Sequence, residues 1–128
     1  QEHAISSPAT FAQHGCVGAL KSSKKYIPRV RKICDYNRHM VINTLGKIQS
    51  LDCPLPEGGF YAYPKVLNRK AMDSSAFSEE LLVQGGVSVI PGTFFGDERT
   101  TFRLCYAMDK NLLAEGLRRI GRFFKARF

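Results

Sequence analysis

Residues 100–107, Thr-Thr-Phe-Arg-Leu-Cys-Tyr-Ala, decide how this chain is organised. The stretch combines β-branched and aromatic residues, which favour a strand. Arg103 stands inside it, between Phe102 and Leu104. Because an unpaired buried charge is costly, the guanidinium needs an ion-pair partner, an edge position that faces water, or an anionic ligand. An arginine fork matches a carboxylate through two parallel hydrogen bonds, so a carboxylate clamp is one of three interpretations that the residues leave open.

The sequence before this strand predicts two helices. Ser7 and Pro8 are typical of a helix start, and the first helix is expected to end near residue 20. The polar residues 21–23 predict a break. A long second helix is expected from about residue 26, with Pro28 in its first turn. Its apolar positions recur at helical spacing: Ile27, Val30, Cys34, Val41, Leu45 and Ile48.

Short strands and helices are expected in the rest of the chain. Residues 60–63 and 87–90 are strand-like, and Ser74 or Ser75 can cap a helix that ends at Gly85-Gly86. Asp109 is expected to cap a last helix. The apolar positions of that helix are Leu113, Leu117, Ile120 and Phe124. The order predicts a two-layer α+β domain: a small antiparallel or mixed sheet of about three strands, packed against the long helix and the C-terminal helix.

Length and charge restrict the function classes. The chain has 128 residues, which is enough for one domain with a real core. No apolar run is long enough for a membrane span, so no membrane partner is expected. The formal net charge is +8. Residues 1–50 carry +6, residues 51–100 carry −3 and residues 101–128 carry +5. The basic ends are typical of solvated helix faces and lack an RNA-binding motif, so we expect no nucleic-acid partner.

Metal and nucleophile motifs are weak. The four cysteines and the histidines His3, His14 and His39 lack the spacing of metal ligands, and we expect no metal and reduced cysteines. Ser22 and Lys25 form a Ser-x-x-Lys spacing, which some serine acylases use. The other motifs of those enzymes are absent, so this spacing favours an ordinary polar segment.

Three further segments resemble one enzyme family. Residues 56–64, Pro-Glu-Gly-Gly-Phe-Tyr-Ala-Tyr-Pro, resemble the P-x-G-x-F-Y segment of fold-type I, class I/II aminotransferases. Residues 86–96, Gly-Val-Ser-Val-Ile-Pro-Gly-Thr-Phe-Phe-Gly, resemble the family's G-V-x-V-x-P-G-x-x-F-G run. Residues 102–107 resemble its F-R-L-x-Y-A strand. The opening Ile5-Ser6-Ser7-Pro8 also resembles the family's sequence. Within the family, the sequence is most similar to the aspartate-aminotransferase-like branch.

The resemblance implies roles for individual residues. Arg103 would bind the substrate α-carboxylate, and Phe60 would lie near the substrate. Pro91, Gly92 and Gly96 would shape a loop at the active-site entrance. Residues 1–22 would be the tail of a large domain and residues 23–128 the small C-terminal domain. The parent protein would be a homodimer that transfers an amino group between an amino acid and a 2-oxo acid.

The resemblance also implies a cofactor, pyridoxal 5′-phosphate (PLP), that this chain does not anchor. The family's Schiff-base lysine precedes the Ser-Pro helix, whereas Lys25 follows it and lacks the family's Gly-x-Arg. We therefore assign no catalytic and no cofactor-binding residue, and expect the 128-residue piece alone to be inactive. A non-catalytic module that binds carboxylates or a partner, and a basic nucleic-acid binder, are the alternatives. The cytoplasm is the expected location.

Overall fold

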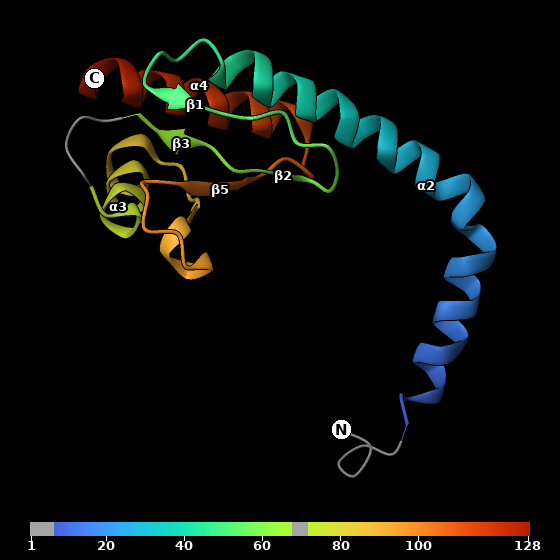
Figure 1. The fold of residues 1–128 in the computed structure, drawn as a ribbon. Coiled ribbons are helices and arrows are strands. Elements are labelled where there is room, and N and C mark those ends of the chain that lie inside the picture. The colour runs from blue at the N-terminus through green and yellow to red at the C-terminus, as the bar shows by residue number, and fades with distance from the viewer. Residues whose placement is uncertain (1–6, 68–71) are drawn as a thin grey trace. The chain divides into compact units, whose positions relative to one another are not determined.

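The computed structural model describes residues 7–67 and 72–128. His3 and the residues Ile5 and Ser6, which the sequence analysis used, lie outside these ranges. The elements are, in order, α2 (Thr10–Leu45), β1 (Leu51–Asp52), β2 (Tyr61–Ala62), β3 (Lys65–Val66), α3 (Ser74–Gly85), β4 (Ile90–Pro91), the 3-10 helix η1 (Gly92–Phe95), β5 (Phe102–Cys105) and α4 (Lys110–Arg127) (Figure 1).

The strands form two small antiparallel sheets. β5 is the central strand of the order β2-β5-β4, and β1 pairs with β3. A bridge between Lys65 and Thr101 links the two sheets, together with hydrogen bonds from the amide of Val66 to the carbonyl of Thr100 and from the amide of Phe102 to the carbonyl of Pro64. In Figure 1, α4 and the C-terminal part of α2 run along one side of the strands, and η1 lies on the other side. The expected α+β fold, with a small sheet against a long helix and a C-terminal helix, is confirmed.

The predicted break at residues 21–23 is wrong, because one helix, α2, runs from Thr10 to Leu45. The hydroxyls of Ser22 and Ser23 donate hydrogen bonds to the carbonyls of Ala19 and Leu20, at 3.1 and 2.7 Å. Such bonds satisfy the serine hydroxyls inside a helix, so the two serines do not end it. Pro28 lies in the helix interior rather than in a first turn. The helix also starts later than Ser7 and Pro8 predict.

The chain divides into two compact units, Gln1–Ile33 and Cys34–Phe128. In the second unit, Val41 and Leu45 are fully buried and Cys34 packs against the core, as the helical spacing predicts. In the first unit, Ile27 is more than half exposed. The expected division at residue 22 stays a prediction. Within the described ranges, no helix has the length and apolar character that crossing a bilayer requires.

The caps of the two later helices follow from their end residues. Asp73, rather than Ser74 or Ser75, caps α3 by accepting a hydrogen bond from the amide of Ala76 at 2.9 Å. Gly86 ends α3 in the left-handed conformation with φ of 64°, which glycine adopts without strain. Asp109 caps α4, as expected, by accepting from the amides of residues 111 and 112. These caps fix where each helix meets the sheet.

The core of the second unit includes a cluster of phenylalanines. Phe77 of α3 lies 5.4 Å, between ring centroids, from Phe102 of β5. It also lies 5.9 and 5.8 Å from Phe123 and Phe124 of α4. The four predicted apolar positions of α4 are all buried. Because each of these rings removes a large apolar area from water, the cluster holds β5 against both helices.

Asn37 joins α2 to the segment that follows β5. The side chain is completely buried, and its amide nitrogen donates to the carbonyls of Tyr106 and Met108 at 2.8 and 2.9 Å. These bonds span about seventy residues of sequence, so they pin the end of β5 to the helix. Buried carbonyls that lose their donor carry a large desolvation penalty.

We predict that Asn37→Ala lowers the free energy of unfolding by about 2–3 kcal/mol, because two carbonyls lose their donor. Asn43→Ala is the matched control, since Asn43 lies on the same helix and is exposed. Its effect should stay within about 0.5 kcal/mol. Urea unfolding followed by tyrosine fluorescence measures both. Equal destabilisation by the two changes would contradict the anchoring role of Asn37.

Candidate functional site

The alternation of β5 separates a buried face from an open one. Phe102 and Leu104 are buried, whereas Arg103 and Cys105 are half-buried. In the register of the sheet, Arg103 lies opposite Ile90 of β4, and Cys105 lies opposite Tyr61 of β2. Because residues directly opposite each other in a sheet share a face, these four side chains belong to the same, open face.

Two aromatic rings hold the guanidinium of Arg103. Its Cζ atom lies 4.3 Å from the ring centroid of Tyr61 and 4.8 Å from that of Phe95. Both distances are in the range of cation–π attraction. Across residues 7–67 and 72–128, no carboxylate forms an ion pair with Arg103. The structural ion pair that the sequence left open is therefore not formed by the described residues.

Phe60 adjoins the same row of side chains. Its ring centroid lies 4.4 Å from that of Tyr61. The carbonyl of Phe60 accepts a hydrogen bond from the amide of Tyr106 at 2.9 Å. The Tyr106 hydroxyl donates to the carbonyl of Gly59 at 3.1 Å, and Gly59 has a φ of 70°. The structure thus brings Phe60 and Arg103 together through Tyr61. Burial raises the pKa of Tyr106.

The loop with Phe95 depends on Gly92. A Cβ atom at this position would lie 1.9 Å from Oγ1 of Thr101 and 2.9 Å from the hydroxyl of Tyr63. Only glycine permits this approach. The loop is tied to α3, since the amide of Thr93 donates to Oγ of Ser74 at 3.0 Å. The prediction that this segment shapes a loop is consistent with its contacts, which fix Phe95 beside Arg103.

Asp97 fixes the other end of that loop. Its carboxylate accepts hydrogen bonds from Nε and Nη2 of Arg99 at 2.8 and 2.9 Å. It also accepts from the Arg99 amide and from Oγ1 of Thr101, both at 3.0 Å. The hydrogen bonds from the Arg99 side chain are the main reason that the pKa of Asp97 lies well below its usual range. The carboxylate is thus a structural brace for the turn into β5.

Lys25 is not placed for cofactor chemistry. It is an exposed residue in the middle of α2, and the Ser22 hydroxyl bonds to a helix carbonyl instead of to Lys25. The described residues also contain no group of three or more His, Cys, Asp or Glu side chains that could hold a metal ion. These residues do not fit a PLP site, because none of the lysines in the described ranges is buried.

The candidate site is thus a half-buried arginine on the central strand of its sheet, with two aromatic rings against its guanidinium. An arginine on a central strand is held more firmly than one on a loop. The sequence analysis selected Arg103 and Phe60. It missed that the rings of Tyr61 and Phe95 lie against the guanidinium of Arg103. The signal for these two rings was their presence in the motifs at residues 56–64 and 86–96. That the two motifs come together beside Arg103 is a tertiary feature, which local sequence does not reveal.

Comparisons with known proteins agree on one family. The sequence profile described as aminotransferase class I and II matches residues 1–120. The chain is 36% identical over 132 residues to a probable aspartate/prephenate aminotransferase of Rhizobium leguminosarum, which covers 96% of the chain and 33% of that protein. It is 37% identical over 120 residues to the protein of the same description from Aquifex aeolicus, covering 91% and 30%.

A solved structure supports the same relationship. The aromatic aminotransferase of Pyrococcus horikoshii superimposes with a TM-score of 0.88 at 32% identity, over 98% of this chain and 34% of that one. The chain thus spans about a third of the length of the relatives it matches. The similarity covers both the core strands and the candidate site.

We predict that Asp97→Asn removes an acid-dependent part of the stability. The lowered pKa means that Asp97 stabilises the fold above the ordinary carboxyl pKa of about 4, and that this contribution is lost as pH falls through the folded-state pKa. The variant should therefore be less stable than the original chain at pH 7, and the gap should narrow below about pH 4.

Urea midpoints at pH 7, 4 and 3 test this prediction. Glu98→Gln is the control, because the adjacent Glu98 is exposed and makes no ion pair with the described residues. If the difference in urea midpoint between Asp97→Asn and the original chain stayed constant with pH, the stabilising role of the Asp97 carboxylate would be contradicted.

Proposed function

The chain belongs to the class I and II aminotransferases, and from this membership we propose that it is the C-terminal part of a PLP-dependent enzyme. That enzyme would transfer an amino group between an amino acid and a 2-oxo acid. The observation that carries the proposal is the guanidinium of Arg103, which lies between two rings on an open sheet face without a carboxylate partner among the described residues. In this proposal residues 1–22 end a large domain and residues 23–128 form the small domain.

Arg103 binds the α-carboxylate of the substrate. Its fork offers two parallel N–H donors, and a charge-assisted bond of this type contributes about 1.5–3 kcal/mol. The rings of Tyr61 and Phe95 restrict the rotation of the side chain, so little freedom remains to be lost on binding. The fixed carboxylate orients the rest of the substrate, which is a large part of catalysis when two groups must meet. Phe60 covers the substrate beside Tyr61.

The cofactor is held outside this chain. PLP supplies the electron sink that amino-group transfer requires. The described residues do not fit it, and in this proposal their contribution is the arginine that binds the substrate. The names of the relatives, aspartate/prephenate and aromatic aminotransferases, favour an aspartate-aminotransferase-like branch. A cytoplasmic homodimer is the assembly that we propose.

A second candidate is a non-catalytic module that binds a carboxylate or a partner. It is favoured by one observation: Arg103 and the two rings that lie against its guanidinium all belong to this chain. The enzyme and the carboxylate-binding module both require Arg103 to bind a carboxylate, and they differ in amino-group transfer.

The prediction for Arg103 is a loss of carboxylate binding. In an NMR titration of the ¹⁵N-labelled chain with 2-oxoglutarate, Arg103→Gln should weaken binding at least about tenfold, because the charged fork is removed. Arg31→Gln is the control, since it removes the same charge from an exposed position on α2. In a protein that joins this chain to its cofactor-binding part, Arg103→Gln should lower kcat/KM about 100-fold.

Unchanged 2-oxoglutarate binding in Arg103→Gln would refute the enzyme and the carboxylate-binding module alike. The isolated chain, supplied with PLP, an amino acid and a 2-oxo acid, should transfer no amino group. Transfer by this chain alone would contradict the placement of the cofactor outside it. If the joined protein binds carboxylate through Arg103 but transfers no amino group, the non-catalytic module is the correct candidate and the aminotransferase is not.

A further inference from the structure

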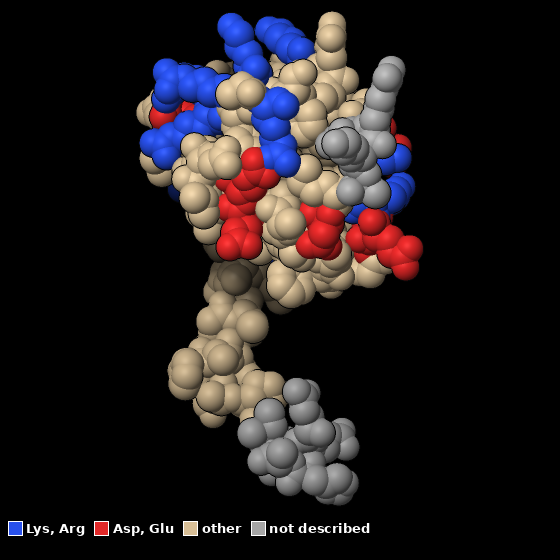
Figure 2. Space-filling view, turned by 90° about the vertical axis from the view of Figure 1, so that its left-hand side faces the viewer, with Lys and Arg blue, Asp and Glu red and all other residues tan. Residues whose placement is uncertain are grey.

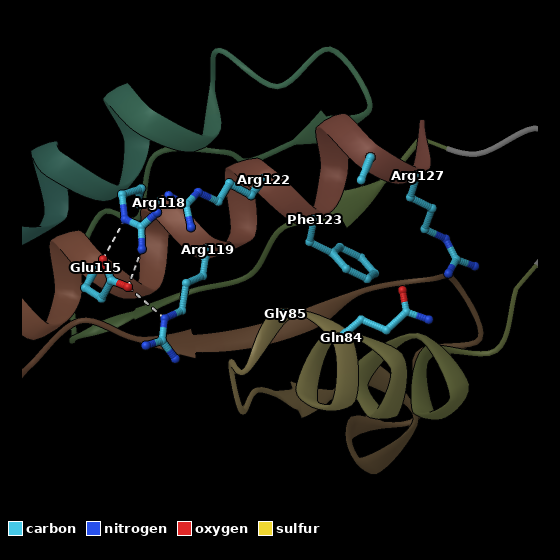
Figure 3. Close-up of a pocket in the computed structure, with 9 residues that line it drawn as sticks. Gln84, Gly85, Glu115, Arg118, Arg119, Arg122, Phe123 and Arg127 are labelled. Carbon is cyan, nitrogen blue, oxygen red and sulfur yellow. Dashed lines mark hydrogen bonds and ion pairs between the residues drawn. The ribbon is translucent and has the colours of Figure 1, made fainter.

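A cavity lined by arginines lies between α3 and α4, away from the residues that surround Arg103. The cavity has a volume of about 620 Å³. Its lining residues are Gln84, Gly85, Glu115, Arg118, Arg119, Arg122, Phe123, Ala126 and Arg127. Four arginines thus face one glutamate. Figure 3 shows the arginines on α4, with Gln84 and Gly85 of α3 across from them.

The positive charge of this cavity is only partly balanced. Glu115 accepts hydrogen bonds from Arg118 at 2.6 Å and from Arg119 at 2.8 Å. These bonds lower the pKa of Glu115 to about 2. Arg127 forms an ion pair with Glu80 of α3. Two glutamates therefore oppose four arginines, and an excess of positive charge remains.

Arg122 carries the excess. It is exposed, and in the described part of the chain no ion pair or hydrogen bond involves it. It follows Arg118 by four residues and Arg119 by three, so the three side chains are neighbours on the helix surface. Figure 2 shows the same segregation on a larger scale, with Lys and Arg gathered toward α4 and Asp and Glu gathered below them.

We propose that this cavity binds a small anion with two or more phosphate groups, such as pyrophosphate or the phosphate chain of a nucleotide. Arginine forks bind phosphate oxygens in pairs, which a lysine does not do. Guanidinium groups spaced along a helix face match several phosphates better than one. The amide of Gln84 offers a further donor from α3.

Glu115 sets the affinity of the site. An incoming phosphate competes with its carboxylate for the donors of Arg118 and Arg119. Removing the carboxylate therefore frees two forks and tightens phosphate binding. This feature distinguishes a specific site from a diffuse basic surface, where the loss of any one charge has the same effect.

Calorimetric titration of the 128-residue chain with pyrophosphate at low salt tests the proposal. Arg122→Gln should weaken binding about tenfold, which is the effect of losing one charge-assisted pair. Glu115→Gln should tighten it several-fold. Lys110→Gln is the matched control, because Lys110 is exposed on the same helix, carries the same charge and does not line the cavity. Its effect should stay below about twofold. Higher salt should weaken binding in every case.

Further ligands identify what is recognised. ATP binding as tightly as pyrophosphate, with no binding of adenosine, assigns recognition to the phosphate chain. Equal losses in Arg122→Gln and Lys110→Gln, or tighter binding of duplex DNA than of pyrophosphate, would overturn the proposal in favour of a non-specific basic surface. Orthophosphate binding as tightly as pyrophosphate would overturn the requirement for two phosphates. Arg122→Gln should weaken pyrophosphate binding by the same factor when Arg103→Gln is already present, so this test is separate from that of the proposed function.

Discussion

The two-residue period of β5 is the constraint on which the rest of the second unit depends. Phe102 and Leu104 must enter the core, and this direction forces Arg103 to the opposite, open face. A slip of one residue would bury the guanidinium and expose Phe102, at a cost that no local rearrangement could offset. The placement of the candidate site is therefore a consequence of the hydrophobic core.

Several long-range contacts then keep β5 in that position. Phe77 of α3 stacks on Phe102 from the core side, and Asn37 of α2 binds the carbonyl of Tyr106 just beyond the strand. Tyr106 in turn pins the segment before Phe60. The core and the site share these residues, so a change that loosens the core also displaces the rings beside Arg103.

The parts of this structure that follow from local sequence could be predicted. The alternation around Arg103, the cap at Asp109 and the stop at Gly86 each depend on a few neighbouring residues. The break expected at residues 21–23 failed because Ser22 and Ser23 bond to the helix that contains them, a choice that their polarity does not reveal. Strands β1 and β3 have two residues each and carry too short a pattern to detect.

The candidate site divides in the same way. Arg103 is conspicuous as a charge in an apolar strand, and Phe60 is marked by its motif. The stacking of Tyr61 and Phe95 on Arg103 joins three separate segments, so no local pattern predicts it. The arginine cavity could not be predicted from the sequence for a related reason. The basic residues of α4 have the spacing of a solvated helix face, and the cavity forms because α3 packs beside them.

The central claim is that the guanidinium of Arg103 is held in place before any ligand arrives. The ¹⁵N relaxation of arginine Nε atoms in the free chain measures this most directly. The account predicts an order parameter for Arg103 well above about 0.6, the limit of flexible groups, while exposed Arg31 falls below it. An Arg103 side chain as mobile as that of Arg31 would contradict the claim, because the two rings would then not hold the guanidinium.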